Sequence, residues 1–235
     1  GPHPPLLTCR SRKDDDHDNS GSHRPMTPRE LIGEAEVPGG PPLRLFRRGS
    51  DFMIVLERNE LMSTRMHGSE VALGTMACDR LAGHKAPHLL IGGYGMGYTL
   101  RAVLGQLGPT ARVTVVELVP GIIDWARGPM AAVTAGCLDD PRVTITMGDV
   151  GASMAHSNAQ YDAILLDVDN GPEGLTRAAN DGLYSPQGLA NAKQALRPGG
   201  SLLMKVFQGE GFNELLQRLR QDYAVLLNRK PEASR

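Results

Sequence analysis

The segment His88–Glu117, HLLIGGYGMGYTLRAVLGQLGPTARVTVVE, contains the pattern that decides the fold. A short apolar run ends in the glycine cluster Gly92–Gly97, a helical pattern follows, and a second β-branched run ends on Glu117. This order predicts a strand, a glycine turn, a helix and a second strand, as in the nucleotide-binding half of a Rossmann-like sheet. Glycines let the backbone come close to a ligand, and the first N–H groups of the helix are free to bind it.

Acidic residues follow three successive predicted strands: Glu117, Asp149 and Asp167. Because the carboxyl ends of parallel strands meet at one edge of a sheet, we expect the three side chains to converge on one crevice. There Glu117 could accept hydrogen bonds from ribose hydroxyls and Asp149 from an adenine amino group, while Asp167 would face the reacting centre. Each acid alone could instead cap a helix N-terminus. Their shared register with the glycine turn favours the ligand site.

The spacing of the glycines limits the class of ligand that we expect. They follow the pattern Gly93-x-Gly95-x-Gly97, and Tyr98 stands where a GxGxxG motif would have its last glycine. We expect this spacing to suit a nucleoside with a sulfonium side chain better than a dinucleotide pyrophosphate.

Composition excludes several classes of protein. The chain has 235 residues, a net charge of −1 and 4% aromatic residues, which argues against a nucleic-acid surface. Its three cysteines are scattered, so they predict neither a disulfide framework nor a zinc site, and a cytoplasmic location is expected. No apolar run is long enough to span a membrane, and the N-terminus lacks a signal-peptide core.

Three regions follow from the local composition. Residues 1–42, rich in Pro, Gly, Ser, Asp and His, predict a disordered leader. Residues 43–66 predict a small unit of short antiparallel strands, and residues 67–235 a Rossmann-like catalytic domain with a mostly parallel, doubly wound sheet. Beyond the opening segment we expect helices over 69–81, 120–135, 187–196 and 212–219, strands over 142–147, 161–167, 201–207 and 223–227, and a long loop over 167–186.

Several blocks in order resemble the spermidine synthase family. They are residues 61–70, 92–101, 116–117, 148–149, 161–167 and 183–185, and the similarity extends roughly from Phe52 to Gly200. The resemblance implies a class I S-adenosylmethionine-type α/β fold behind a small β-domain, usually in a homodimer. Members of that family pass the aminopropyl group of decarboxylated S-adenosylmethionine to an amine.

The same resemblance implies roles for individual residues and no metal. Asp167 matches the catalytic aspartate, a base for the attacking amine. The expected nucleoside-binding residues are Gly92, Gly93, Gly95, Gly97, Glu117, Asp149 and Val150. The expected substrate contacts are Asp169, Tyr184 and Glu70.

Two departures from the family pattern bear on the substrate. The family turn is Gly-Gly-Gly-Asp-Gly-Gly, and Gly95 stands where its acid would hold the aminopropyl amine. The loop from Asp167 to Pro172 does not have the second acid of the family's Asp-Ser-Ser-Asp-Pro in register. A diamine dication needs a carboxylate at each end, because an unpaired buried ammonium is costly. The departures favour full S-adenosylmethionine as the donor.

The C-terminal forty residues carry a second resemblance. Residues 196–212 and 229–235 are similar to the FtsJ-type ribosomal RNA 2′-O-methyltransferases, which use a Lys-Asp-Lys-Glu tetrad. Lys205 matches the second lysine, and Asp167 lies at the strand end of the aspartate. No lysine matches the first position, and the glutamate lies beyond the end of the sequence. We therefore expect a join between two related folds near Gly199-Gly200, with the last strand of the sheet missing.

The sequence predicts a spermidine-synthase-like transferase that moves a methyl or aminopropyl group from S-adenosylmethionine, or its decarboxylated form, to a small nucleophile such as an amine. Ribosomal RNA 2′-O-methylation through Lys205 is one alternative. A catalytically decayed nucleoside-binding or regulatory module is the other. We expect a small-molecule acceptor and a homodimer, with no membrane partner and RNA not favoured.

Overall fold

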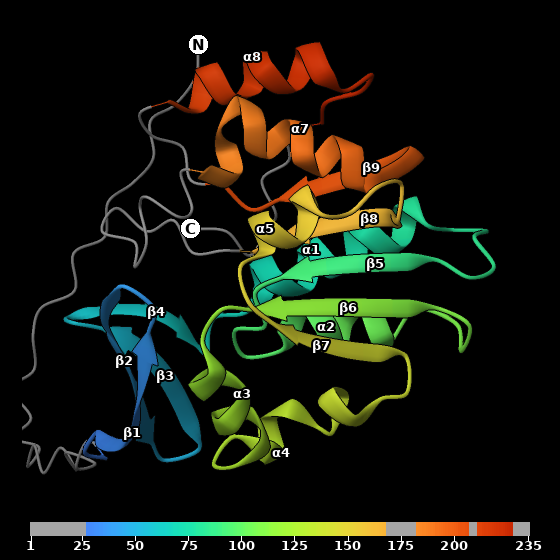
Figure 1. The fold of residues 1–235 in the computed structure, drawn as a ribbon. Helices are drawn as coiled ribbons and strands as arrows, with labels where there is room; N and C mark the ends of the chain where they lie inside the picture. Colours follow the sequence, from blue (N-terminus) through green and yellow to red (C-terminus); the bar gives the residue numbers. More distant parts are fainter. Residues whose placement is uncertain (1–26, 168–181, 207–210, 228–235) are drawn as a thin grey trace, which may run out of the picture.

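The computed structural model describes residues 27–167, 182–206 and 211–227. These residues form a four-stranded antiparallel sheet and a five-stranded parallel sheet (Figure 1). The arrowheads of β5 and β6 point toward the antiparallel sheet, so the carboxyl edge of the parallel sheet faces the smaller unit.

The antiparallel sheet is a meander in the order β1-β2-β3-β4. Its strands are β1 (Glu30–Val37), β2 (Gly40–Arg48), β3 (Asp51–Leu56) and β4 (Asn59–Ser63). The leader predicted over residues 1–42 is wrong from Glu30 onward, because β1 pairs with β2 and buries Ala35 and Val37. The Pro- and Gly-rich residues between them form a hairpin turn, with Gly39 at a φ of 72°.

The parallel sheet has the order β7-β6-β5-β8-β9, and all its described pairs are parallel. The strands are β5 (His88–Gly92), β6 (Arg112–Glu117), β7 (Val143–Met147), β8 (Tyr161–Leu166) and β9 (Leu196–Met204). The helices are α1 (Gly68–Arg80), α2 (Tyr98–Leu104), α3 (Pro120–Arg127), α4 (Ala131–Thr134), α5 (Val150–Ala155), α7 (Pro186–Ala195) and α8 (Phe212–Asp222). The chain runs outward from β5 in both directions, so the switch point of this doubly wound fold lies between β5 and β8.

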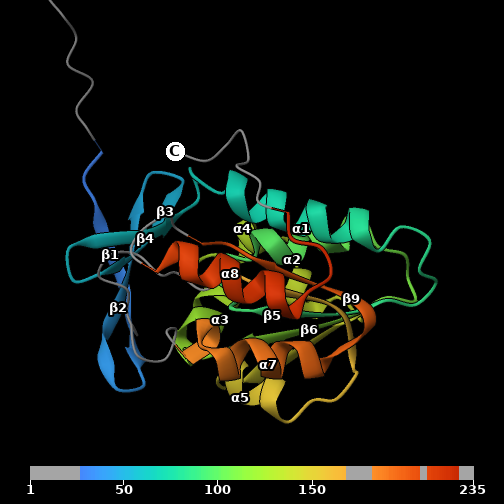
Figure 2. The ribbon, with the colours of Figure 1, turned by 90° about the horizontal axis from the view of Figure 1, so that it is seen from above.

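Helices cover both faces of the parallel sheet, with α1 and α2 on one side and α5 and α7 on the other (Figure 2). Strand residues alternate between two hydrophobic clusters: Leu89 and Ile91 belong to the first, and Leu90 to the second. All of β8 is buried, as expected for a central strand that is covered on both faces. The predicted α/β class, with an antiparallel unit in front, is therefore confirmed.

Three predicted elements differ in the structure. The helix expected over 120–135 is divided at Gly128-Pro129, because proline removes a backbone donor and disfavours helical geometry before it. Strand β9 starts at Leu196, ahead of the predicted 201–207, with a register irregularity opposite Tyr161 and Ala163. The predicted strand over 223–227 is wrong: none of these five residues lies in a strand, and Val225 is 69% exposed.

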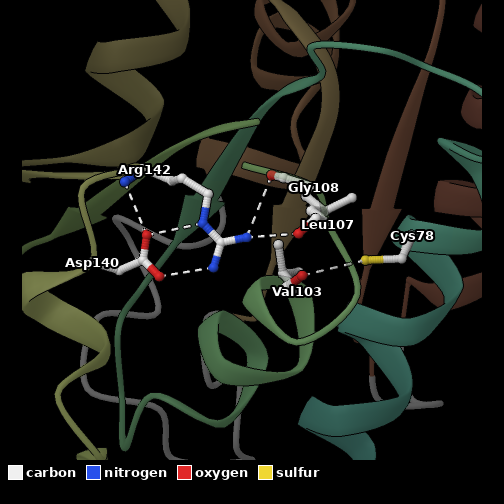
Figure 3. Close-up of polar contacts among 6 residues, drawn as sticks. All are labelled: Cys78, Val103, Leu107, Gly108, Asp140 and Arg142. Carbon is white, nitrogen blue, oxygen red and sulfur yellow. Dashed lines mark hydrogen bonds and ion pairs between the residues drawn. The ribbon is translucent and has the colours of Figure 1, made fainter. Parts of the chain in front are cut away.

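A polar clamp ties two loops together at the amino edge of the sheet, away from the carboxyl ends (Figure 3). The Arg142 guanidinium donates to both carboxylate oxygens of Asp140 at 2.8 and 2.9 Å. It also donates to the Leu107 carbonyl at 2.7 Å, so the loop after α2 is joined to the start of β7. The two ion-pair hydrogen bonds lower the pKa of Asp140 to about 2.

Candidate active site

The glycine turn leaves β5 at the switch point and depends on backbone angles that residues with a Cβ rarely adopt. Gly93, Gly95 and Gly97 have φ values of 84°, 58° and 80°. The Gly93 N–H donates to the Val116 carbonyl at 2.8 Å, so the turn remains attached to β6 as it curves over the strand ends. Gly97 then occupies the N-cap position of α2.

Glu117, the last residue of β6, holds this turn through hydrogen bonds from backbone N–H groups. One carboxylate oxygen accepts the Tyr94 N–H at 2.8 Å, and the other accepts the Val119 N–H at 2.9 Å. The side chain is buried, and burial raises the pKa of Glu117 while these backbone N–H groups lower it. The N–H groups of Gly95 and Leu118 lower this pKa as well, so the backbone of the turn and of the segment after β6 together hold the carboxylate.

Asp167 follows β8 directly and lies beside the start of the turn, where its N–H donates to the Gly92 carbonyl at 3.3 Å. Burial raises the pKa of the Asp167 carboxyl. The Lys205 ammonium lowers that pKa, the Glu70 carboxylate raises it, and hydrogen bonds from Lys205 and Thr99 lower it. The carboxyl group is therefore held by donors in a largely dry position.

Lys205 bridges two carboxylates from different layers of the fold. Its Nζ lies 3.3 Å from Asp167 Oδ1 and 3.4 Å from Glu70 Oε1. Glu70 comes from α1, Asp167 follows β8, and Lys205 follows β9. The side chains of Asp167, Glu70 and Lys205 are 12%, 17% and 23% exposed, so the trio is largely buried, and its two carboxylates line a crevice.

The crevice lies over the switch point, and residues from α1, β4, the glycine turn and the end of β8 line it. The lining residues are Met62, Ser63, Glu70, Gly93, Tyr94, Gly95, Met96, Tyr98, Thr99 and Asp167. The structure thus brings together four predicted site residues, namely Glu70, Gly93, Gly95 and Asp167. The other lining residues were not predicted from the sequence. Among them, Thr99 could have been found from its position in the first turn of α2, directly after the glycines.

The remaining predicted residues lie around or away from the crevice. Gly92 ends β5 against Val150, which is buried, and Tyr184 packs with the second hydrophobic cluster. Asp149 caps α5, where its carboxylate accepts the Ala152 N–H at 2.7 Å, as the helix-cap alternative predicted. Asp169 lies outside the described residues.

Among the described residues, no group of three or more His, Cys, Asp or Glu side chains could hold a metal ion. Within the same ranges, no helix has the length and apolar character needed to cross a membrane.

Comparison with known proteins gives two kinds of relative. Polyamine aminopropyltransferase of Mycobacterium tuberculosis is 31% identical over 163 residues, which is 68% of this chain and 29% of that protein. Ribosomal RNA large subunit methyltransferase E of Hydrogenovibrio crunogenus is 61% identical over 44 residues, 19% of this chain and 21% of that protein. The chain therefore spans less than a third of either curated relative.

The fold comparison agrees with the first relative. A crystal structure of spermidine synthase in complex with the transition state analogue AdoDATO superposes with a TM-score of 0.67 at 17% identity. The superposition covers 83% of this chain and 66% of that one. The model of the spermine/spermidine synthase domain matches residues 77–224, more than half of the chain, and includes the glycine turn, Glu117 and Asp167. The chain belongs to the spermine/spermidine synthase family.

Proposed function

We propose that the chain binds an S-adenosylmethionine-type nucleoside at the switch point and transfers an alkyl group from its sulfonium to a small nucleophile. The observation that supports this most is the buried Asp167 carboxyl, which lies at the wall of the crevice formed by the glycine turn. Family membership supports the same reading. The small-molecule acceptor and the homodimer are parts of this proposal.

The chemistry needs alignment and one proton acceptor. A lone pair of the nucleophile forms a bond to the carbon beside the sulfonium, the carbon–sulfur bond breaks, and its electron pair stays on sulfur. The proton of the nucleophile passes to Asp167, whose raised pKa makes it a better base than an exposed aspartate. Holding both reactants in a closed crevice supplies much of the remaining rate enhancement.

The turn favours a donor that keeps its carboxylate. Gly95 has a φ of 58°, and a Cβ at this position would lie 3.2 Å from the sulfur of Met62. With no acidic side chain here, the turn adds no charge that would repel the carboxylate of full S-adenosylmethionine. We therefore propose full S-adenosylmethionine as the preferred donor, ahead of its decarboxylated form.

Calorimetry tests the nucleoside site. The chain is titrated with S-adenosylmethionine, decarboxylated S-adenosylmethionine and methylthioadenosine, and we expect the first to bind best. If none of the three binds, the proposal is wrong. The variant Asp167→Asn should retain nucleoside affinity but lose turnover, since an amide cannot take the proton; unchanged turnover would exclude the role of Asp167 as base.

One observation favours a second function, methyl transfer to ribosomal RNA. Lys205 lies beside Asp167, and the chain shares a short segment of high identity with the methyltransferase of H. crunogenus. In that case Lys205→Ala should abolish methylation of ribosomal RNA without weakening nucleoside binding, and persistent methylation would refute it. Nucleoside binding without transfer to any acceptor would instead identify a regulatory module.

A further inference from the structure

The two carboxylates that line the crevice hold an ammonium group of the protein itself. The Lys205 ammonium lies within 3.4 Å of carboxylate oxygens of both Glu70 and Asp167. Among the described residues that line the crevice, these two acids are the charged ones. The carboxylates that could receive a protonated amine of an acceptor thus already share an ammonium group.

Main-chain hydrogen bonding fixes the position of the Lys205 backbone. The Lys205 N–H donates to the Leu166 carbonyl at 3.0 Å, which continues the pairing of β8 with β9 up to the residue before Asp167. Lys205 therefore follows β9 directly beside the end of β8, which Asp167 follows. Only the four-carbon side chain can change the position of Nζ without breaking this pairing.

From this geometry we propose that Lys205 occupies the amine subsite as a built-in cation. The acceptor then reaches Asp167 uncharged, as a hydroxyl or a neutral amine, and a diamine dication is rejected. This inference rests on the proposed alkyl transfer and specifies its acceptor class. Lys205 acts as a specificity-determining residue, whichever alkyl group is transferred.

The balance of charge supports the proposal. Two carboxylates and one ammonium leave a single net negative charge, and the sulfonium of the donor nucleoside compensates it. A dication placed in the same crevice would meet both the sulfonium and Lys205 with no free carboxylate among the described lining residues. Like charges brought together in a partly dry site weaken binding strongly.

The proton transfer remains balanced with Lys205 in place. Asp167 Oδ1 accepts from the ammonium, and the carboxylate still has further lone pairs for the proton of a hydroxyl or neutral amine. The nucleophile gives this proton up as its lone pair bonds to carbon, and the sulfur leaves with the electron pair of the broken bond.

The test replaces Lys205 and measures the affinity of the chain for 1,4-diaminobutane by calorimetry, with methylthioadenosine present. In Lys205→Gln the two carboxylates are freed, and we expect affinity for the diamine to rise at least about tenfold, because the like charge is gone. The matched control Lys205→Arg keeps the cation and should bind the diamine as weakly as the native chain. The double variant Lys205→Gln/Glu70→Gln should lose the gain, because one of the two carboxylates is removed.

Thermal melting of each variant shows that the comparison is made on folded protein, and Lys205→Met serves as a second neutral variant. Equal diamine affinity in the native chain and both neutral variants would overturn the proposal, and so would an equal gain in Lys205→Arg. The methylthioadenosine titration of the native chain is read separately. A failure there refutes the nucleoside site, whereas a missing gain with intact nucleoside binding refutes only the role of Lys205.

Discussion

Replacing Gly97 by alanine tests two reasons why this position needs glycine: its positive φ and its close contact with Tyr94. Gly97 has a φ of 80°, and a residue with a Cβ in this left-handed region costs about 1–2 kcal/mol. A Cβ at Gly97 would also lie 2.5 Å from the Tyr94 hydroxyl oxygen and 2.8 Å from the ring carbon that bears it. The ring is buried, with its hydroxyl 3.5 Å from Cys137 Sγ, so it has little room to move.

Forcing a side chain into a packed site costs about 1–3 kcal/mol, so Gly97→Ala should lower the free energy of unfolding by about 2–5 kcal/mol in total. Gly83→Ala is the matched control. Gly83 has a φ of 88°, but a Cβ there would meet no atom within 4 Å. This control should therefore cost about 1–2 kcal/mol, from the backbone angle alone.

Urea denaturation of the two variants gives the comparison directly. We expect Gly97→Ala to lose at least about 1 kcal/mol more than Gly83→Ala, because overpacking is added to strain. Displacing Tyr94 also disturbs the N–H that Glu117 accepts, so nucleoside affinity should fall only in Gly97→Ala. Equal losses of stability in the two variants would refute the steric part of the argument.

Two further predictions concern groups outside the crevice. Asp140→Asn should lower the free energy of unfolding by about 1 kcal/mol at pH 7, because it breaks a partly buried ion pair with Arg142. The folded-state pKa of Asp140 is lowered to about 2, so the ion pair should stabilise the fold fully above the unfolded pKa of about 3.9 and lose its effect as pH falls through 2. Denaturation of the native chain and of Asp140→Asn at pH 7, 4 and 2.5 measures this. A stability difference that does not shrink in acid would contradict the prediction. Burial raises the pKa of the Cys78 thiol to about 11, and its Sγ lies 3.9 Å from the Val103 carbonyl oxygen (Figure 3). At pH 8 the peptide that contains Cys78 should react with iodoacetamide only after unfolding in urea, and rapid labelling of the native chain, read by peptide mass spectrometry, would show that the thiol is accessible.

The sequence predicted the elements whose patterns are local. The apolar run and glycines of His88–Gly97 specify a buried strand and a turn with positive φ, and the structure has both. The position of Asp167 at a strand end was predictable because carboxyl ends of parallel strands share an edge. Strand β1 was missed because Gly and Pro at positions 38–42 suggest disorder when they are counted by composition, while the residues before them alternate as a strand.

Local sequence patterns could not predict the contacts between elements that are distant in the chain. Lys205 could be matched to a motif, but its bridge to Glu70 depends on the register of β9 against β8 and on where α1 crosses the sheet. Asp149 shows a second limit of local patterns. An acid that binds a ligand at a strand end and an acid that caps the next helix have the same local sequence. Only the three-dimensional arrangement distinguishes which of these acids lines the crevice.

The contact between the meander and α3 has a spectroscopic consequence. Trp125 is the only tryptophan of the chain, lies in α3 and is 7% exposed. A Cβ at Gly33 of β1 would be 3.1 Å from the indole nitrogen, so the antiparallel unit shields this ring from water. Separation of the two units would hydrate the indole and shift its fluorescence to longer wavelength while the parallel sheet stays intact. The chain thus carries its own optical probe for the docking of its two units.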